Sequence, residues 1–504
     1  MKYSVNSIIF IALCAFCLMS CNNWLDVRPE TEQKDEDQFS SVTGFFDALV
    51  GCYMSMADDD VYGQRLSYTD IELLANMWYI PESITSEEYE DMSNHDYTTD
   101  DSRDAISAIY SGLFYAIAQA NMVLENAEAR GNDVFVDESM LNVVKGEAYA
   151  IRAYCQFDVL RLFGQMPQGG TQQVELPYNL GTGIDEMPAY YTFAEYVELL
   201  KSDLQQAETY LEENDPVYDN AFEDVSGLNL ASDYLYYRQS RLNYWAVKAL
   251  QARVHLYLGE TVDAYNAAKA IITGNGGEPV RAMSGATDLP TYRLCPNEFL
   301  FALSKYDIST VSTEVLLGAT GNQYRLDGAY LALSPAMYTE LYADLSTQYR
   351  VSYNRRNNWW GASEEPTTHE SYSTLAKYYY DNTNGSMETS TLMNYYQWVP
   401  MLRMSEVYLI GMETTTDLNE LNEWYVDYLE AHGISSTIVT PWASLEERQS
   451  FIFNEYRREF FGEGQMFYTC KRNASPYTWN STTVVDEGDY VLPLPRTEYN
   501  PNNL

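Results

Sequence analysis

Several motifs of enzyme chemistry are missing from this sequence. Its four histidines, His95, His255, His369 and His432, are far apart, and neither an HExxH motif nor a cysteine–histidine cluster is present. A GxSxG turn, which would present a nucleophilic serine, is also absent. The GxxxxGK[ST] and GxGxxG loops that cradle phosphates do not occur. These absences argue against zinc proteases, serine hydrolases and simple nucleotide-binding enzymes.

Basic residues are scarce. The chain of 504 residues contains 30 lysines and arginines against 73 acidic residues, which gives a formal net charge of -43. Such a surface repels phosphate groups, so nucleic acids and anionic lipid headgroups are poor partners. The acidity favours solubility outside the cell, although some carboxylates could hold structural calcium. We predict no calcium ligand at a specific residue, no other metal site and no cofactor.

Beyond its N-terminus, the chain lacks an apolar run of about 18 residues that would span a bilayer. The run Ile8 to Leu18 follows Lys2 and has the length of a secretion signal. It ends at Leu18-Met19-Ser20-Cys21, which is similar to a bacterial lipobox. We expect residues 1–20 to be removed, Cys21 to carry lipid and residues 21–38 to form a polar tether. A buried N-terminal helix or an uncleaved anchor is the alternative, which the polar residues after Cys21 oppose.

Beyond the predicted signal peptide, which contains Cys14 and Cys17, cysteine pairs with metal-binding or redox spacing are also absent. Four cysteines remain after the signal peptide and Cys21, and each lies in an apolar or aromatic setting: Cys52, Cys155, Cys295 and Cys470. We therefore expect buried free thiols rather than a disulfide framework or a zinc site.

Tyrosine, in contrast, is abundant, with 45 residues beside nine tryptophans. A tyrosine ring offers contact area and its hydroxyl offers a directional hydrogen bond. Most of these rings will be ordinary half-buried helix residues. The composition still favours a surface that recognises sugars or peptides.

Apolar residues recur at helical spacing over most of the chain, with small residues where neighbouring helices would touch. His255 falls on one of these apolar faces and is expected in the core. The predicted helices are 39–56, 105–129, 141–163, 191–211, 242–258, 262–272, 401–412, 418–431 and 445–461. Segment 61–101 shows no clear period. The pattern predicts an all-α dominated fold of tetratricopeptide-repeat-like helical pairs.

Residues 275–398 differ in character, because glycine, serine, threonine, asparagine and aromatic residues replace the helical pattern. Short apolar pieces such as residues 299–303 are candidate strands. We predict a long, irregular, loop-rich insertion here, between an N-terminal helical domain at 39–274 and a C-terminal helical segment at 399–504.

Several stretches, taken in order, resemble the SusD/RagB family of outer-membrane lipoproteins. They are Trp24-Leu25-Asp26 after Cys21, the segments 145–167 and 245–257, the segment 402–410, Arg457-Arg458-Glu459 through Gly464, and Leu492-Pro493-Leu494-Pro495 leading to Asn500-Pro501-Asn502. Gly411-Met412-Glu413 departs from the usual Ala-Glu pair, and an Arg-rich link before the last helix is missing. These departures affect the scaffold and leave the resemblance intact.

The resemblance implies a non-catalytic nutrient-binding protein on the outer membrane, facing the cell exterior and acting as a lid on a SusC-like TonB-dependent transporter. It implies a tetratricopeptide-repeat domain with a variable part that carries the ligand site. On this view Arg152 and Arg458 brace carboxylates between helices rather than touch ligand.

Candidate ligand contacts are aromatic and polar residues in the predicted loops. The densest cluster is Arg355, Arg356, Asn357, Asn358, Trp359 and Trp360, where indole rings could stack on sugars and polar groups could bind hydroxyls. A second candidate is Tyr68, Trp78 and Tyr79. For either tryptophan of the first cluster, a place in the insertion's own small core is the competing interpretation, and for Trp78 it is a buried helix end.

The function predicted from the sequence is capture of a glycan and its delivery to the transporter. A peptide ligand, as in RagB-like branches, is the first alternative. A surface adhesin or structural lipoprotein without a small ligand is the second. A glycosidase is the third, since a chain with 73 acidic residues always permits some pair of carboxylates at the required spacing.

Overall fold

The computed structural model describes residues 35–80, 86–182, 188–222, 225–285, 287–316, 331–364, 371–380, 385–475, 486–496 and 498. The predicted signal peptide, Cys21 and most of the predicted tether lie outside these residues.

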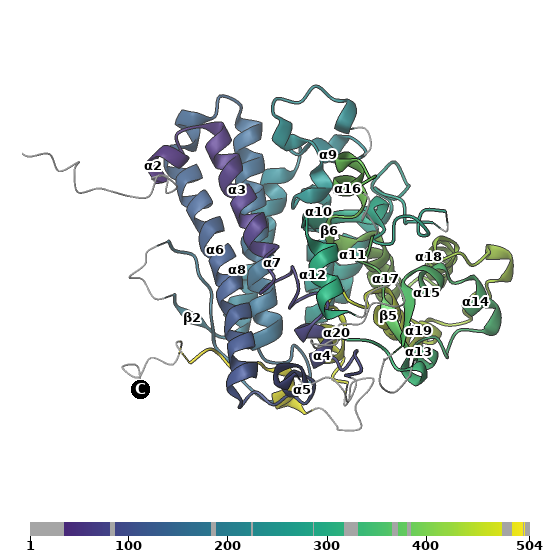
Figure 1. Ribbon diagram of the computed structural model, residues 1–504. Coiled ribbons are helices and arrows are strands. Elements are labelled where there is room, and N and C mark those ends of the chain that lie inside the picture. Colours follow the sequence, from purple (N-terminus) through teal and green to yellow (C-terminus); the bar gives the residue numbers. More distant parts are fainter. Residues whose placement is uncertain are drawn as a thin grey trace, which may run out of the picture.

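The N-terminal half is built from long helices that lie side by side (Figure 1). They are α3 (Val42–Met56), α6 (Asp100–Val134), α7 (Glu138–Phe163) and α8 (Phe193–Leu211), preceded by the short α2 (Asp35–Gln38). Helix α6 contacts both α3 and α7, and α7 contacts α8. Each long helix begins at a polar cap; Thr192 and Glu195, for example, form a capping box at the start of α8.

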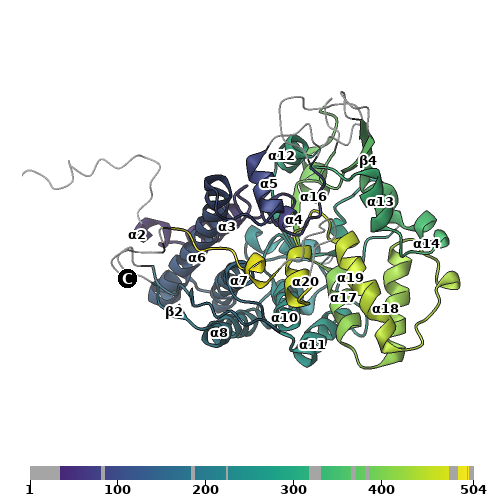
Figure 2. The same ribbon diagram turned by 90° about the horizontal axis from the view of Figure 1, so that it is seen from below.

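The array continues through the second half of the chain. Its helices are α10 (Tyr244–Leu258), α11 (Thr261–Ile272), α17 (Met404–Thr414), α18 (Leu418–Ala431), α19 (Arg448–Glu459) and α20 (Met466–Arg472). Neighbours pack in the order α8, α10, α11, α17, α18. Viewed from below, α6, α7 and α8 lie on one side and α17, α18 and α19 on the other (Figure 2). This succession confirms the predicted all-α dominated, tetratricopeptide-repeat-like fold.

Strands and short helices fill the region predicted as an irregular insertion. Strand β3 (Phe299–Ser304) pairs antiparallel with β6 (Trp398–Arg403), and β4 (Trp360–Glu364) pairs antiparallel with β5 (Ser371–Leu375). The short helices are α12 (Ile308–Val315), α13 (Pro335–Leu341), α14 (Thr347–Ser352), α15 (Asn354–Asn358) and α16 (Thr389–Tyr395). The described parts of this region thus contain more regular structure than predicted, and the limits of the insertion at 274 and 398 stay a prediction.

The remaining elements are short. They are α4 (Asp70–Leu74), α5 (Glu87–Ser93), α9 (Pro216–Asp219), the antiparallel pair β1 (Leu176–Pro177) and β2 (Tyr190–Tyr191), and the 3-10 helices η2 (Val225–Gly227), η3 (Asp233–Leu235), η4 (Arg238–Ser240), η5 (Pro296–Glu298), η6 (Ser436–Ile438), η7 (Leu445–Glu447) and η8 (Glu487–Tyr490).

Two predictions need correction. Segment 61–101 contains α4 and α5, and the helix predicted from Met401 begins at Met404, because residues 401–403 complete β6.

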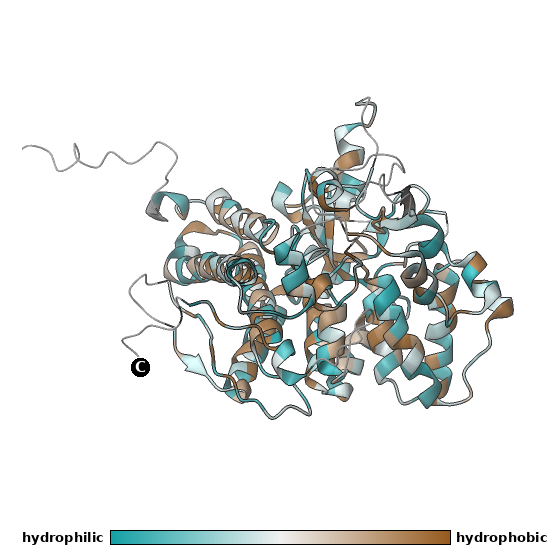
Figure 3. Ribbon diagram, turned by 60° about the horizontal axis from the view of Figure 1, so that its bottom comes forward, coloured by the Kyte–Doolittle hydropathy of each residue, from teal (hydrophilic) through white to brown (hydrophobic). Residues whose placement is uncertain are grey.

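Hydrophilic and hydrophobic residues alternate along the helices, as expected for helices with one buried side (Figure 3). Among the described helices, α6 is long and apolar enough to cross a membrane by length and composition. Half of its most apolar window is buried inside the fold, where α6 packs against α3 and α7. We therefore treat α6 as a core helix.

The four cysteines of the described chain, Cys52, Cys155, Cys295 and Cys470, are all buried and unpaired. Burial raises the pKa of the Cys52 thiol to about 12, so this thiol stays protonated at neutral pH. The prediction of buried free thiols is confirmed.

Buried ion pairs hold the helices to one another. Arg152 of α7 binds Asp203 of α8 at 2.6 Å, and Arg253 of α10 binds Glu406 of α17 at 2.6 Å. The prediction that Arg152 braces a carboxylate between helices is confirmed. Arg458 binds Glu455 of its own helix at 2.6 Å and also Asp344, so it joins α19 to the chain after α13.

The most extensive of these networks surrounds Arg403 at the end of β6. Its guanidinium binds Glu298 at 3.2 Å, Glu459 at 2.8 Å and Glu463 at 2.9 Å, and all four residues are buried. Burial favours the neutral acid, but Arg355 and Arg403 outweigh this and hold the pKa of Glu459 well below its usual value. The network therefore keeps its charges inside the protein.

Glu72 on α4 is a buried carboxyl group outside this network. Its Oε1 atom accepts hydrogen bonds from the backbone N–H groups of Gly462 at 3.0 Å and Gly464 at 2.9 Å. Burial raises its pKa to about 8, from an ordinary value of 4.5. Between these two pH values the folded protein holds a proton that the unfolded chain releases, so the contribution of Glu72 to stability is lost as pH rises through about 8.

We therefore expect Glu72→Gln, which keeps the shape and the accepting oxygen but cannot titrate, to flatten the dependence of stability on pH. The fall in unfolding free energy between pH 5 and pH 8 should be smaller in the variant by roughly 2–4 kcal/mol. Urea unfolding at the two pH values measures this, with the exposed Glu212→Gln as control. Equal pH dependence in Glu72→Gln and the unaltered protein would show that Glu72 does not titrate in this range.

Candidate ligand-binding site

The first cluster predicted from the sequence is largely part of the core. Trp359, at the end of α15, is 1% exposed, and its Nε1 atom donates a hydrogen bond to the carbonyl of Arg293 at 2.7 Å. The Nζ atom of Lys377 lies 3.8 Å from the centre of the Trp359 ring. Arg355 is fully buried and binds Glu298 at 3.0 Å. Neither Trp359 nor Arg355 faces solvent, so the interpretation of Trp359 as a core residue is the correct one.

The other members of this cluster also have partners within the protein. Trp360, half-buried, donates from Nε1 to the hydroxyl of Tyr342 at 2.8 Å, and Arg356 lies over the Tyr342 ring at 5.7 Å. Asn358 donates to the carbonyl of Asn354 at 2.7 Å. Asn357 is exposed. One exposed asparagine and a half-buried ring do not make a stacking platform.

The second predicted cluster is also inside the fold. Tyr68 and Trp78 are at most 1% exposed, and Trp78 donates from Nε1 to the carbonyl of Tyr68 at 2.8 Å. Tyr79 is half-buried and stacks on Tyr372 with ring centres 5.7 Å apart. The competing interpretation of Trp78, as a buried residue rather than a ligand contact, is therefore the correct one. Its ring packs edge-on against Phe461, with ring centres 4.7 Å apart.

Half-exposed aromatic rings gather instead around the end of α16. Tyr395 stacks on Tyr292 with ring centres 4.1 Å apart and an angle of 18° between the planes. Tyr396 packs against Tyr292 at 5.9 Å and against Tyr380 at 5.2 Å. All four rings are partly accessible, and we call them the tyrosine cluster. Paired flat rings at a surface provide the apolar faces on which sugar rings stack.

A hollow of about 650 Å³ adjoins the tyrosine cluster, and Tyr395 lines both. We call it the tyrosine hollow. Its other lining residues include Tyr236, Tyr237, Asp233, Gln239, Asn297 and Asn394. Its size falls within the range of small-ligand sites, and its lining combines aromatic faces with amide and hydroxyl groups. Such a lining suits a ligand rich in hydroxyl groups.

Buried contacts fix the backbone beside the most exposed ring of the hollow. Tyr237 is 61% exposed and has a left-handed backbone with φ of 54°. The next residue, Arg238, is buried and binds Glu147 and Asp215, each at 2.7 Å. Because Arg238 is locked, Tyr237 is held toward solvent at the rim. An anchored aromatic residue loses less conformational freedom on binding.

Little in the sequence pointed to this site. Its tyrosines come from four separated segments, around residues 236, 292, 380 and 395, and each lies among residues of ordinary polarity. The abundance of tyrosine was the available signal. It indicates a recognition surface but does not say which rings meet there.

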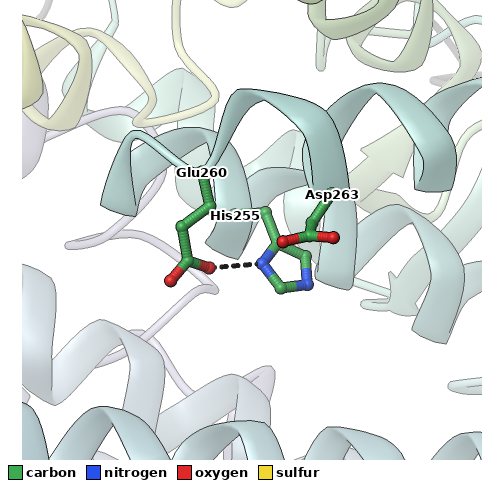
Figure 4. A group of neighbouring side chains, drawn as sticks. All are labelled: His255, Glu260 and Asp263. Carbon is green, nitrogen blue, oxygen red and sulfur yellow. Dashed lines mark hydrogen bonds and ion pairs between the residues drawn. The ribbon is translucent and has the colours of Figure 1, made fainter.

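Among the described residues, one group of potential metal ligands lies close together: His255, Glu260 and Asp263, at the turn between α10 and α11 (Figure 4). The Nδ1 atom of His255 lies 2.6 Å from Glu260, whose other oxygen binds the ammonium of Lys201 at 2.5 Å. Burial opposes ionisation of Glu260, but hydrogen bonds from Lys201 and His255 hold its pKa below the usual value. Lys201 already supplies a cation here, so this group is a surface ion pair. His255 is half-buried rather than in the core as predicted.

The helical array and the hollow together define a helical-repeat protein with a tyrosine-lined hollow at its surface. Comparison with known proteins is consistent with that class. A family of SusD-like proteins described as "Starch-binding associating with outer membrane" matches residues 23–256.

Among curated proteins, the chain is similar to the SusD-like protein P2 of Formosa agariphila, with 26% identity over 166 residues, or 33% of this chain. The chain spans 30% of the length of that relative. The predicted resemblance to the SusD-like family is confirmed.

Solved structures share the fold over nearly the whole chain. A SusD superfamily protein from Bacteroides thetaiotaomicron matches with a TM-score of 0.68 and 20% identity, covering 92% of this chain and 98% of that one. A laminarin-binding SusD-like protein matches with a TM-score of 0.62 and 17% identity, covering 91% and 97% of the two chains. The family is carbohydrate-binding and associated with the outer membrane.

Proposed function

We propose that this protein is a non-catalytic lipoprotein that captures an oligosaccharide or polysaccharide and delivers it to a SusC-like TonB-dependent transporter. Cys21 would carry the lipid anchor, and the protein would face the cell exterior. The observation that carries the proposal is the tyrosine hollow, where stacked, half-exposed rings adjoin a lining of amide and hydroxyl groups. The laminarin-binding neighbour supports a glycan as the ligand.

Binding rather than hydrolysis is supported by the lining of the hollow. Glycosidases use two carboxyl groups on either side of the scissile bond, about 5 to 9 Å apart. Among the described residues that line the hollow, Asp233 supplies one carboxylate. The hollow offers contact area and hydrogen bonds, which suit reversible capture and release.

The binding step is tested by titrating the full chain, purified in detergent, with starch, laminarin, xylan and mannan in a calorimeter. The double variant Tyr237→Ala/Tyr395→Ala is expected to lower the affinity for the best ligand at least about tenfold, because it removes two stacking faces from the hollow. The control is Tyr115→Ala, which removes a ring that is 62% exposed on α6 and does not line the hollow. Its affinity should equal that of the unaltered protein.

Unchanged binding in the double variant would place the ligand elsewhere. If peptides bind and all four glycans fail to bind, the ligand class is wrong. Delivery is tested separately, by solubilising native outer membranes and asking whether a transporter barrel co-purifies with the protein. The absence of any barrel would contradict the proposed partnership.

A further inference from the structure

Acidic and basic side chains balance inside the protein. Among the described residues, eleven acidic and eleven basic side chains are buried, and many of them form ion pairs, such as Arg152 with Asp203 and Arg253 with Glu406. Their formal charges cancel, so the formal net charge of -43 falls on the rest of the chain. A carboxylate or sulfate group that approaches the protein therefore meets repulsion.

The arginines near the site are directed toward the main chain. Arg281, which lines the tyrosine hollow, is 9% exposed, donates from Nη1 to the carbonyl of Phe299 at 2.6 Å and lies over the Phe222 ring at 4.8 Å. Arg293, beside the tyrosine cluster, donates from Nη1 to the carbonyl of Tyr379 at 3.1 Å. A guanidinium recognises an anionic group best through two parallel N–H donors. Each contact directs one donor of its arginine to the main chain and away from a ligand.

Apart from Arg281, the polar side chains that line the hollow are uncharged or acidic. Gln239, Asn297 and Asn394 carry amides, which donate to and accept from sugar hydroxyls without a formal charge. Asp233 is exposed, begins η3 and places a carboxylate at the lining. A hydroxyl can donate a hydrogen bond to this carboxylate, whereas an anionic substituent cannot.

We infer that the tyrosine hollow takes an uncharged glycan and discriminates against polysaccharides that carry carboxylates or sulfate esters. This inference rests on the proposed function and narrows its ligand class. It follows from the acidic exterior, the arginines held by main-chain carbonyls and the amide-rich lining.

Matched ligands provide the test. The full chain in detergent is titrated with starch, laminarin, xylan and mannan and with the carboxymethyl derivative of each, so that backbone and linkage stay constant. For the best neutral ligand, the carboxymethyl form is expected to bind at least about tenfold more weakly at about 0.02 M NaCl. The difference should narrow at about 0.5 M NaCl, where repulsion is screened.

The variant Asp233→Asn removes the carboxylate from the hollow and is expected to lower the ratio of neutral to carboxymethyl affinity by roughly two- to threefold. Equal or tighter binding of the carboxymethyl forms would overturn the inference while leaving glycan capture intact. A ratio that does not respond to salt would overturn it as well. Failure of every polysaccharide to bind would overturn the proposed function and this inference together.

Discussion

Arg403→Met is expected to lower the free energy of unfolding by about 3–5 kcal/mol. Methionine fills much of the same volume but carries no charge, so Glu298, Glu459 and Glu463 lose the cation that they share. Arg355, bound to Glu298 and Glu459, and Lys377, bound to Glu463, remain to compensate, and the Nε2 atom of His432 lies 2.9 Å from Glu459. Three buried carboxylates with too few cations are costly, because water solvates buried charges poorly.

Urea unfolding at pH 7 measures the effect, and two variants set its scale. Arg403→Lys keeps the charge but loses the planar fork of donors. Its free energy of unfolding should therefore lie between those of the unaltered protein and Arg403→Met. Arg496 is 67% exposed and lies 3.5 Å from Asp100, so Arg496→Met should change stability by less than about 0.5 kcal/mol. A loss of under about 1 kcal/mol in Arg403→Met would mean that the network is not a main source of stability.

Trp359→Ala is expected to cost about 3–5 kcal/mol of stability and to leave the glycan affinity of the folded protein unchanged. The ring is 1% exposed, lies under the ammonium of Lys377 and donates a hydrogen bond to the carbonyl of Arg293. Its removal leaves a cavity and an unsatisfied acceptor. Trp359→Phe should lose less stability than Trp359→Ala, because phenylalanine keeps most of the ring volume and gives up only the hydrogen bond.

The comparison with Tyr237→Ala/Tyr395→Ala separates the two candidate ligand sites. Calorimetry of the folded fraction should show normal affinity in Trp359→Ala and weakened affinity in the double variant, whose rings are at the surface. The opposite pattern, with normal stability and lost binding in Trp359→Ala, would restore the sequence-based assignment of the ligand to residues 355–360.

The helices could be predicted because each carries its own signal. The apolar period, the polar caps and stops such as Gly259, which has a φ of 78°, are local properties of the sequence. The limits of α18 were therefore predicted correctly from residues 418–431 alone. Met401 was wrongly assigned to a helix. Residues 398–403 form a strand because they pair with β3, and this partner, about a hundred residues away in the sequence, produces no pattern in the local sequence.

The proposed site depends on tertiary contacts throughout, which explains why its residues were not predicted from the sequence. The polar neighbours of Arg355 in the sequence predicted an exposed side chain. In the structure, Arg355 is buried because it binds Glu298 and Glu459, which are distant in the sequence. Tyr292 and Tyr395 lie in unrelated segments and meet only in the folded protein. Composition favoured a recognition surface, which stays a prediction, whereas the burial of each ring follows from the packing of helices around it.

The four cysteines of the described chain have a consequence for how this protein matures. Because none of them is bonded to another, the described fold has no covalent cross-link, and buried ion pairs such as those of Arg403 and Arg238 hold distant segments together instead. Ion pairs form without transfer of electrons, whereas a disulfide needs an oxidant and enzymes to shuffle it. The described fold therefore needs no oxidant to form a cross-link among these four cysteines.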